Sequence, residues 1–302
     1  MTEANDIAIA DAHQHFWDLD RNYHPWLCDS EPIPFRYGDY SALRQTYMPD
    51  DYRRDSADFK VVRTVHVEAE HDPRNPLTET LWLEDVAAKH GLPTAIVAAA
   101  WLDRDDVEEV LSAQAARGMV RGIRHKPAAA ASPGAAKRGA SGSMDDERWR
   151  RGYAMLGPLG LSFDLQTPWW HLDAAAELAR DFPDTQIVIN HTGLPADRSD
   201  DGLNGWRRAL EVVAAQGNVA IKISGLGRPG LPWTLEANGP IVRDTIAIFG
   251  TDRCMFASNY PVDRLAGSFE DIYSGFMAAT EAFPQSERKA LFHDNAVRIY
   301  RL

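Results

Sequence analysis

The 302-residue sequence is poor in cysteine and lacks long hydrophobic runs. Its two cysteines, Cys28 and Cys254, lie far apart in the chain, so no disulfide framework is indicated. The sequence contains no run of about 18 apolar residues, and its N-terminus has neither a basic segment nor an apolar leader. These absences predict a cytoplasmic protein without a membrane segment.

An excess of basic residues is also missing, because the formal net charge is −12. This charge argues against nucleic acid and anionic membranes as partners and leaves a small molecule as the expected partner. The sequence has no G-x-G-x-x-G loop, no P-loop and no G-x-S-x-G nucleophile elbow. A nucleotide cofactor and a serine nucleophile are therefore disfavoured.

What the sequence does show is an alternation of short apolar runs with amphipathic stretches. The predicted strands are 7–15, 61–68, 94–99, 120–125, 161–166, 186–191, 219–224 and 254–259. The predicted helices are 76–90, 103–117, 145–156, 172–181, 203–215, 235–249 and 269–282. Strand–helix alternation on this scale predicts one α/β domain over residues 1–302, a (β/α)8 TIM barrel that can be distorted. The competing fold is a doubly wound sheet. It would require a glycine-rich loop after an early strand, and none follows the first strand.

Two segments interrupt the alternation and are predicted to be loop insertions at the C-terminal mouth of the barrel. Residues 22–58 are rich in Pro, Tyr and Asp and are expected to wrap the mouth. Residues 128–143 read AAAASPGAAKRGASGS, which is low in complexity and lacks large apolar side chains. A tolerated mobile loop and a substrate lid are both compatible with this second segment.

The end of the first strand carries two histidines, His13 and His15. Because side chains alternate along a strand, both are expected to face the same way, together with Asp11. Two imidazoles side by side form part of a metal site or of a polar catalytic floor. His66 and Glu68 share one face of the second strand by the same argument.

Polar side chains recur at the ends of the other strands. They are Arg124, His125, Gln166, Asn190, His191, Lys222, Ser224, Ser258, Asn259 and Tyr260. Functional residues of a (β/α)8 barrel gather at the carboxyl ends of its strands, so we expect one shared polar site. An unpaired buried ammonium is costly, and Lys222 is expected to form a salt bridge with Glu68. Trp169 is expected either to line an apolar substrate wall or to pack a helix on the barrel, and Tyr260 shares that ambiguity.

Several of these residues stand in short motifs whose order and spacing are specific as a set. The motifs read D-A-H-Q-H-F-W, Y-H-P-W-L, V-E-A-E, G-I-R-H-K-P, I-N-H-T-G-L-P, K-I-S-G-L, M-F-A-S-N-Y-P-V-D and D-N-A-V-R-I-Y-R-L. Over nearly the whole chain they resemble the amidohydrolase-related family. This is the metal-dependent (β/α)8-barrel hydrolase branch that includes sugar lactonases and pyrone-dicarboxylate lactonases.

The resemblance implies a mononuclear divalent-metal site or its relic. His13 and His15 match the family's first-strand pair, and His191 matches the sixth-strand histidine, so these three are the expected ligands. Asn259 stands where the wider superfamily usually carries an aspartate. Asparagine is neutral, is a poor base and is a weaker ligand. The sequence therefore leaves open whether one divalent metal, zinc or manganese, is bound or none.

The predicted function is hydrolysis of a lactone or related ester of a small carboxylated or sugar-derived metabolite. The expected catalytic residues are His191 as general base, His125 and Asn259. The expected substrate-binding residues are Arg124, Gln166, Lys222, Trp169 and Tyr260, with Lys126 as a further cation for a substrate carboxylate.

Two other functions remain open at this point. One is a metal-dependent decarboxylase, which the same superfamily contains. The other is a catalytically silent barrel that binds a metabolite, which the asparagine at position 259 makes reasonable. The aromatic-rich insertions could also form the interface of a homodimer.

Overall fold

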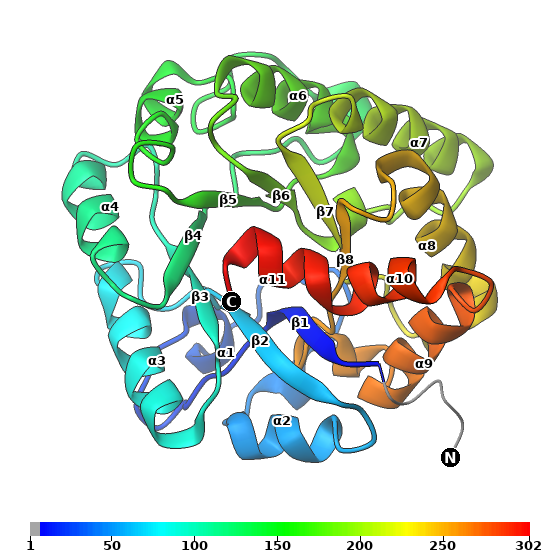
Figure 1. The fold of residues 1–302 in the computed structure, drawn as a ribbon. Coiled ribbons are helices and arrows are strands. Elements are labelled where there is room, and N and C mark those ends of the chain that lie inside the picture. The colour runs from blue at the N-terminus through cyan, green and yellow to red at the C-terminus, as the bar shows by residue number, and fades with distance from the viewer. Residues whose placement is uncertain (1–6) are drawn as a thin grey trace.

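The computed structural model describes residues 7–302 and contains one parallel sheet with the strand order β1 to β8. The strands are β1 (Ile9–Gln14), β2 (Val61–Val67), β3 (Ala95–Ala99), β4 (Val120–Arg124), β5 (Ser162–Leu165), β6 (Ile187–Ile189), β7 (Val219–Ile223) and β8 (Cys254–Phe256). The segment after β8 returns to β1, where the Tyr260 carbonyl accepts from the His15 amide at 2.8 Å. The nearly closed (β/α)8 barrel that the alternation predicts is therefore confirmed (Figure 1).

Helices surround the barrel in the order that the alternation requires. They are α1 (Pro25–Cys28), α2 (Pro49–Asp55), α3 (Pro76–His90), α4 (Val107–Ala115), α5 (Glu147–Tyr153), α6 (Leu172–Asp181), α7 (Asp200–Ala214), α8 (Leu235–Phe249), α9 (Phe269–Ala279), α10 (Gln285–Lys289) and α11 (Asn295–Tyr300). Helix α3 ends as predicted because Gly91 adopts the left-handed conformation at its C-cap. Helix α8 begins where the Thr234 hydroxyl accepts from the Ala237 amide. Four short helices, α1, α2, α10 and α11, were not predicted.

The first strand departs from the simple alternation. Asp11 pairs with Thr64 and Gln14 with His66, so three steps on β1 match two steps on β2. This bulge places Asp11 on the side of α2, where its carboxylate accepts from the Tyr52 hydroxyl at 2.7 Å. The expectation that Asp11 faces the same way as His13 and His15 is wrong, and the irregular register is the reason.

The second strand also orients its polar residues differently from the prediction. The imidazole of His66 lies against α3, with Nε2 3.3 Å from Glu79 and Nδ1 accepting from the Phe16 amide. Glu68 comes after the end of β2 and contacts Arg124 at the barrel mouth. His66 and Glu68 therefore do not share a face.

The inside of the barrel is filled by small and branched apolar side chains together with one face of α11. These residues are Ala10, Ala12, Val65, Val67, Val97, Val188, Ala220, Met255, Ala257, Ala296, Ile299 and Tyr300. Figure 1 shows α11 lying across one end of the barrel. Along each strand, the polar residues at the carboxyl end follow the residues of this apolar layer. The apolar layer therefore lies beneath the site.

One ion pair is buried within this interior. The Lys222 ammonium lies 2.6 Å from Asp164 Oδ1, and both side chains are fully buried. The Tyr300 hydroxyl of α11 lies 3.0 and 3.1 Å from the two oxygens of the same carboxylate. The predicted Lys222–Glu68 salt bridge is therefore wrong, because β5 supplies a nearer carboxylate and Glu68 pairs with Arg124.

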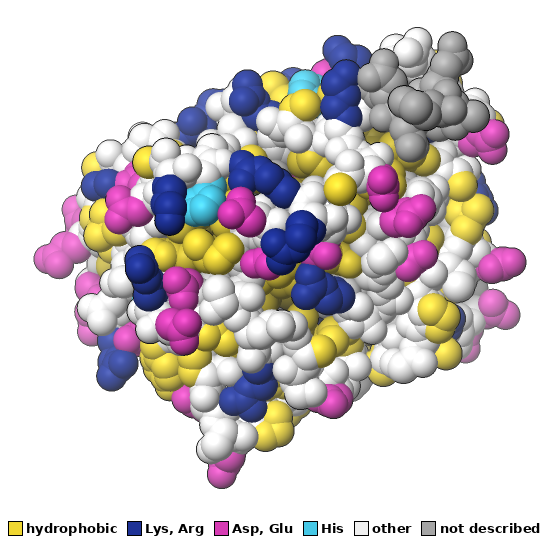
Figure 2. Space-filling view, turned by 90° about the horizontal axis from the view of Figure 1, so that it is seen from below, with side chains coloured by type: hydrophobic (Ala, Val, Ile, Leu, Met, Phe, Trp, Pro, Cys, Tyr) yellow, Lys and Arg dark blue, Asp and Glu magenta, His cyan; other side chains and the backbone are white. Residues whose placement is uncertain are grey.

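The first insertion does reach the mouth of the barrel. Ile33, Pro34, Phe35 and Arg36 from residues 22–58 line the central cavity described below. Residues 128–143 are mostly exposed, and the Ala130 carbonyl accepts from the Trp170 indole at 3.0 Å. Among residues 7–302, no helix has the length and apolar character needed to cross a membrane. Acidic, basic and hydrophobic side chains are interspersed on the face that Figure 2 shows.

Replacing Asp164 by Asn is expected to destabilise the barrel strongly, because it leaves the Lys222 ammonium buried without a counter-charge. Removing one partner of a buried ion pair costs about 3–5 kcal/mol. The control Tyr300→Phe deletes only the hydroxyl that donates to the same carboxylate and should cost about 1 kcal/mol. Urea denaturation measures both free energies of unfolding, and equal losses for the two variants would contradict this account.

Candidate active site

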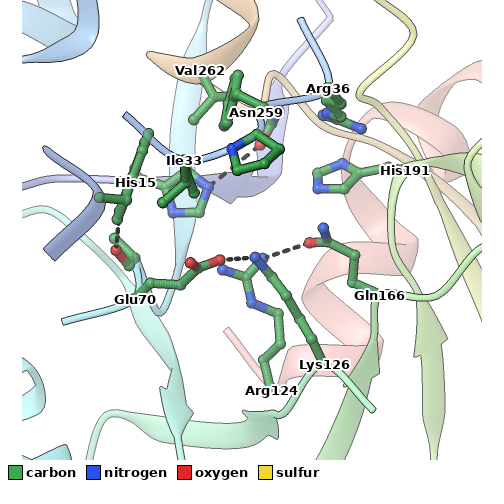
Figure 3. A pocket seen from close by; sticks show the side chains of 14 residues that line it. His15, Ile33, Arg36, Glu70, Arg124, Lys126, Gln166, His191, Asn259 and Val262 are labelled. Carbon is green, nitrogen blue, oxygen red and sulfur yellow. Dashed lines mark hydrogen bonds and ion pairs between the residues drawn. The ribbon is translucent and has the colours of Figure 1, made fainter. Parts of the chain in front are cut away.

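A cavity of about 270 Å³ opens at the carboxyl ends of the strands. Its lining comes from many elements and from the first insertion (Figure 3). The lining residues are His15, Trp26, Ile33, Pro34, Phe35, Arg36, Ala69, Glu70, Arg124, Lys126, Gln166, His191, Asn259 and Val262. The structure therefore brings together five of the predicted site residues, namely His15, Arg124, Gln166, His191 and Asn259, and also Lys126.

Three buried imidazoles lie together at the floor of this cavity. His13 Nε2 is 3.2 Å from His15 Nε2, and the ring centres of His13 and His191 are 4.7 Å apart. His15 Nδ1 lies 2.7 Å from the Val67 carbonyl, which can only accept, so this nitrogen carries the proton. Burial lowers the pKa of all three histidines well below 6.5, and the nearby cations Lys222, Arg124 and Arg36 lower these pKa values further. The imidazoles are therefore neutral at physiological pH.

His191 is held differently from the other two histidines. It follows β6 in a turn with φ +52°, a conformation that is costly for a residue with a side chain. Its Nδ1 lies 3.0 Å from the Ser224 hydroxyl of the segment after β7. Within the described part of the chain, no hydrogen bond to Nε2 is present. His191 therefore presents an uncommitted nitrogen in a residue that lines the cavity.

The side chain of Asn259 is fixed by an aspartate that the sequence reasoning missed. Asn259 Nδ2 donates to Asp263 Oδ1 at 2.6 Å, which turns the amide oxygen toward His15 Nε2 at 3.3 Å. Asp263 also accepts from the Tyr37 hydroxyl at 2.8 Å and from the Gly225 amide at 3.0 Å. Burial raises the pKa of Asp263, and these donors together with Arg36 oppose that rise. The site therefore has a carboxylate four residues beyond Asn259, but it contacts the amide and not the cavity centre.

Each cation at the cavity wall has an acidic partner. Arg124 Nε lies 2.5 Å from Glu68 Oε1 in a buried pair, and Lys126 forms an ion pair with Glu70. Arg36 Nη2 lies 3.6 Å from Asp263 Oδ1. These pairs balance the positive charges at the wall. Glu70 closes the V-E-A-E motif but was not named as a site residue, and Arg36 lies in the first insertion, where no motif or strand end marks it.

Other predicted site residues lie outside this cavity. His125 accepts from the Leu102 amide and the Trp149 indole and lines a neighbouring cavity instead. Arg124 is the last residue of β4 and His125 follows it directly, and their side chains point to different sides, Arg124 toward the central cavity and His125 toward Leu102 and Trp149. Lys222 lies beneath the floor, 3.5 Å from His13 Nδ1.

The two aromatic candidates are also packed away from the cavity. The Trp169 indole lies against Gly205 of α7, which is the packing role that the sequence left open for it. Tyr260 packs on Phe269 and donates to the Gly267 carbonyl at 3.1 Å.

The donor groups do not fit a divalent metal site of the expected kind. No cluster of three or more His, Cys, Asp or Glu side chains in residues 7–302 is arranged to hold a metal ion. The His13 and His15 Nε2 atoms are 3.2 Å apart, and the oxygen 3.3 Å from His15 Nε2 belongs to the neutral amide of Asn259. The expected ligand set of His13, His15 and His191 is therefore not assembled around one point.

The profile of the amidohydrolase family matches residues 10–302. The chain belongs to this family. It is 43% identical to an uncharacterized protein of Sinorhizobium fredii over 99% of this chain and 100% of that protein. It is 30% identical to the L-fucono-1,5-lactonase of Burkholderia ambifaria over 97% of this chain and 95% of that enzyme.

A solved structure agrees with the family assignment. It is an amidohydrolase from Burkholderia multivorans with bound zinc, with a TM-score of 0.79 and 25% identity over 98% of this chain and 99% of that one. Together with the lactonase relatives, it supports the prediction of an amidohydrolase-family hydrolase.

Replacing Gly225 by Ala is expected to disturb His191 specifically. A Cβ at this position would lie 2.7 Å from the His191 Nδ1 and 2.8 Å from an Arg36 nitrogen, and φ is +64°. The control Gly230→Ala has nearly the same φ, +66°, but no atom within 4 Å of the added carbon. Both variants should lose about 1 kcal/mol to backbone strain, and only Gly225→Ala should also shift the imidazole NMR signals of His191. Identical spectra and stabilities for the two variants would contradict the packing described here.

Proposed function

We propose that the protein hydrolyses an uncharged, sugar-derived lactone with His191 as the general base. The observation that carries the proposal is the free Nε2 of a neutral imidazole at the cavity wall. A general base must be unprotonated at working pH and within reach of the water that it activates. His191 meets the first condition through burial and the second through its place among Arg36, Gln166 and Asn259 (Figure 3).

In the proposed reaction, His191 Nε2 takes a proton from water while the oxygen of that water bonds to the lactone carbonyl carbon. The proposal requires that the Ser224 hydroxyl, 3.0 Å from Nδ1, accepts a hydrogen bond from Nδ1–H, because that tautomer leaves Nε2 unprotonated. When the ring C–O bond breaks, the imidazolium returns the proton to the leaving alkoxide oxygen. The products are a hydroxy acid and the neutral base.

The side chains of Gln166 and Arg36 are placed to stabilise the negative charge that develops on the lactone carbonyl oxygen. Arg124 Nη1 donates to Gln166 Oε1 at 3.3 Å, which leaves the Gln166 amide N–H groups for a ligand. Arg36 lies beside His191, and its guanidinium has N–H groups besides the one that faces Asp263 at 3.6 Å. Fixed donors of this kind supply much of the catalysis in acyl-transfer enzymes. The steps of this scheme use only side chains of this chain, because residues 7–302 contain no cluster of three or more His, Cys, Asp or Glu arranged to hold a metal ion.

The charge pairs favour the sugar-derived substrate over the carboxylated one. A substrate carboxylate would have to displace Glu68, Glu70 or Asp263 from its cation, or accept a cation that is already paired. An uncharged lactone needs no such exchange, and its hydroxyls can donate to the Asn259 amide oxygen and to Glu70. The L-fucono-1,5-lactonase relative supports the same class of substrate.

Replacing His191 by Asn should lower kcat for L-fucono-1,5-lactone by roughly 10²- to 10⁴-fold, the usual contribution of a general base. Folding should be little affected.

The control His293→Asn removes an imidazole whose Nδ1 contacts Asp294 outside the cavity, and it should keep the wild-type rate. Proton release in weakly buffered solution measures the rate after subtraction of spontaneous hydrolysis. An equal rate for His191→Asn and wild type would remove His191 from the mechanism, and release of carbon dioxide from an aromatic acid would favour the decarboxylase alternative.

The pH dependence provides a separate test of the same base. The neutral form of His191 is the active one, and burial lowers its pKa well below 6.5. The value of kcat/KM should therefore be constant from about pH 8 down to the ordinary imidazole pKa and should fall only in more acidic solution. An acidic limb centred at or above 6.5 would contradict a buried imidazole base.

A further inference from the structure

A second cavity of about 350 Å³ lies beside the central one. Trp26, Ile33, Glu70, Arg124 and Lys126 line both cavities, so the two spaces are neighbours across the Lys126–Glu70 ion pair. The remaining lining residues are Pro25, Glu68, His71, Pro73, Ala99, Trp101 and His125. The proposed hydrolysis uses Arg124 and Glu70, which line both cavities, and none of the residues that line the second cavity alone.

The wall of the second cavity is formed largely by flat and apolar side chains. The Trp26 indole is held by a hydrogen bond from its Nε1 to the Ala69 carbonyl at 2.9 Å. The Trp101 indole has the Arg104 guanidinium 5.5 Å from its ring centre. Pro25 and Pro73 add rigid apolar surface. Aromatic walls of this kind bind flat rings by stacking and edge contacts.

A buried polar group in the same wall lacks a partner. His71 is only 7% exposed, lines the cavity, and its Nδ1 forms no hydrogen bond in the described structure. An unsatisfied buried nitrogen is costly, and such groups in native proteins are commonly completed by a ligand or by water. The charged residues of this cavity are already paired as Arg124–Glu68 and Lys126–Glu70. The cavity is therefore suited to an uncharged ring that carries a hydroxyl group.

We propose that the second cavity is a binding site for a neutral hydroxylated aromatic ring. The ring packs against Trp101 and Trp26, and a rotation of the His71 imidazole, whose Nδ1 is buried as it stands, lets the hydroxyl group of the ring complete its hydrogen bonding. Where the proposed function holds, this ring is a substituent of the lactone that occupies the central cavity. Only that last step rests on the proposed function, since binding of the ring alone does not require turnover.

The test uses the full chain and 4-fluorophenol as the probe, with binding followed by ¹⁹F NMR. Wild type should bind the probe saturably. Trp101→Ala removes the stacking surface and Ala99→Leu fills the cavity from the end of β3, so each should weaken binding at least about tenfold, which corresponds to roughly 1.4 kcal/mol. The matched control Trp170→Ala removes an indole outside both cavities and should bind as wild type does.

The outcomes separate this proposal from the proposed function. Absence of saturable binding, or binding that neither Trp101→Ala nor Ala99→Leu weakens, would overturn the second site, whatever the rate of lactone hydrolysis. Saturable binding that both variants weaken supports the site even if L-fucono-1,5-lactone is not hydrolysed. In that case only the assignment of the central cavity would fail.

Discussion

The barrel mouth gathers several buried ionisable side chains, and the need to pair their charges shapes the rest of the site. Lys222 is neutralised by Asp164 beneath the floor, and Arg124 by Glu68 at the wall. Unpaired, either cation would carry a desolvation penalty of several kcal/mol. The same burial and the same cations keep the imidazoles neutral. A neutral base and a charge-balanced cavity thus follow from one constraint.

An asparagine at position 259 is consistent with the need to pair the buried charges. A carboxylate at that position would add a negative charge close to Asp263, which already faces Arg36. The amide instead donates to Asp263 and turns its oxygen toward the cavity floor, where it can accept from a substrate hydroxyl. The substitution of asparagine for the usual aspartate therefore changes the chemistry of the site from an additional base or ligand to a neutral acceptor.

The sequence alone predicted the architecture, because the pattern of each apolar run and each amphipathic stretch indicates which of its residues are buried. It also placed Arg124, Gln166, His191 and Asn259 at strand ends, where the barrel brings them together. It could not identify the bulge in β1, which reverses the side that Asp11 faces. Periodicity describes a regular strand, whereas a bulge depends on the register with the neighbouring strand.

Salt bridges between residues far apart in the chain could not be predicted from the sequence either. Lys222 needed an acidic partner, but whether Glu68 or Asp164 supplies it depends on barrel geometry. Arg36 enters the site from the insertion after β1, whose path no local pattern fixes. His125 shows a different limit of sequence-based prediction. Arg124 and His125 are adjacent in the chain, and the sequence pattern did not indicate which of the two faces the centre of the barrel.

The central claim is that a charge-balanced cavity hydrolyses a neutral lactone, and a comparison of two substrates tests it most directly. Purified protein would be assayed with L-fucono-1,5-lactone and, separately, with 2-pyrone-4,6-dicarboxylate, with spontaneous hydrolysis subtracted from both rates. The account predicts a kcat/KM for the neutral lactone that is at least about tenfold higher, a difference of roughly 1.4 kcal/mol in transition-state stabilisation. An equal or higher kcat/KM for the dicarboxylate would contradict it.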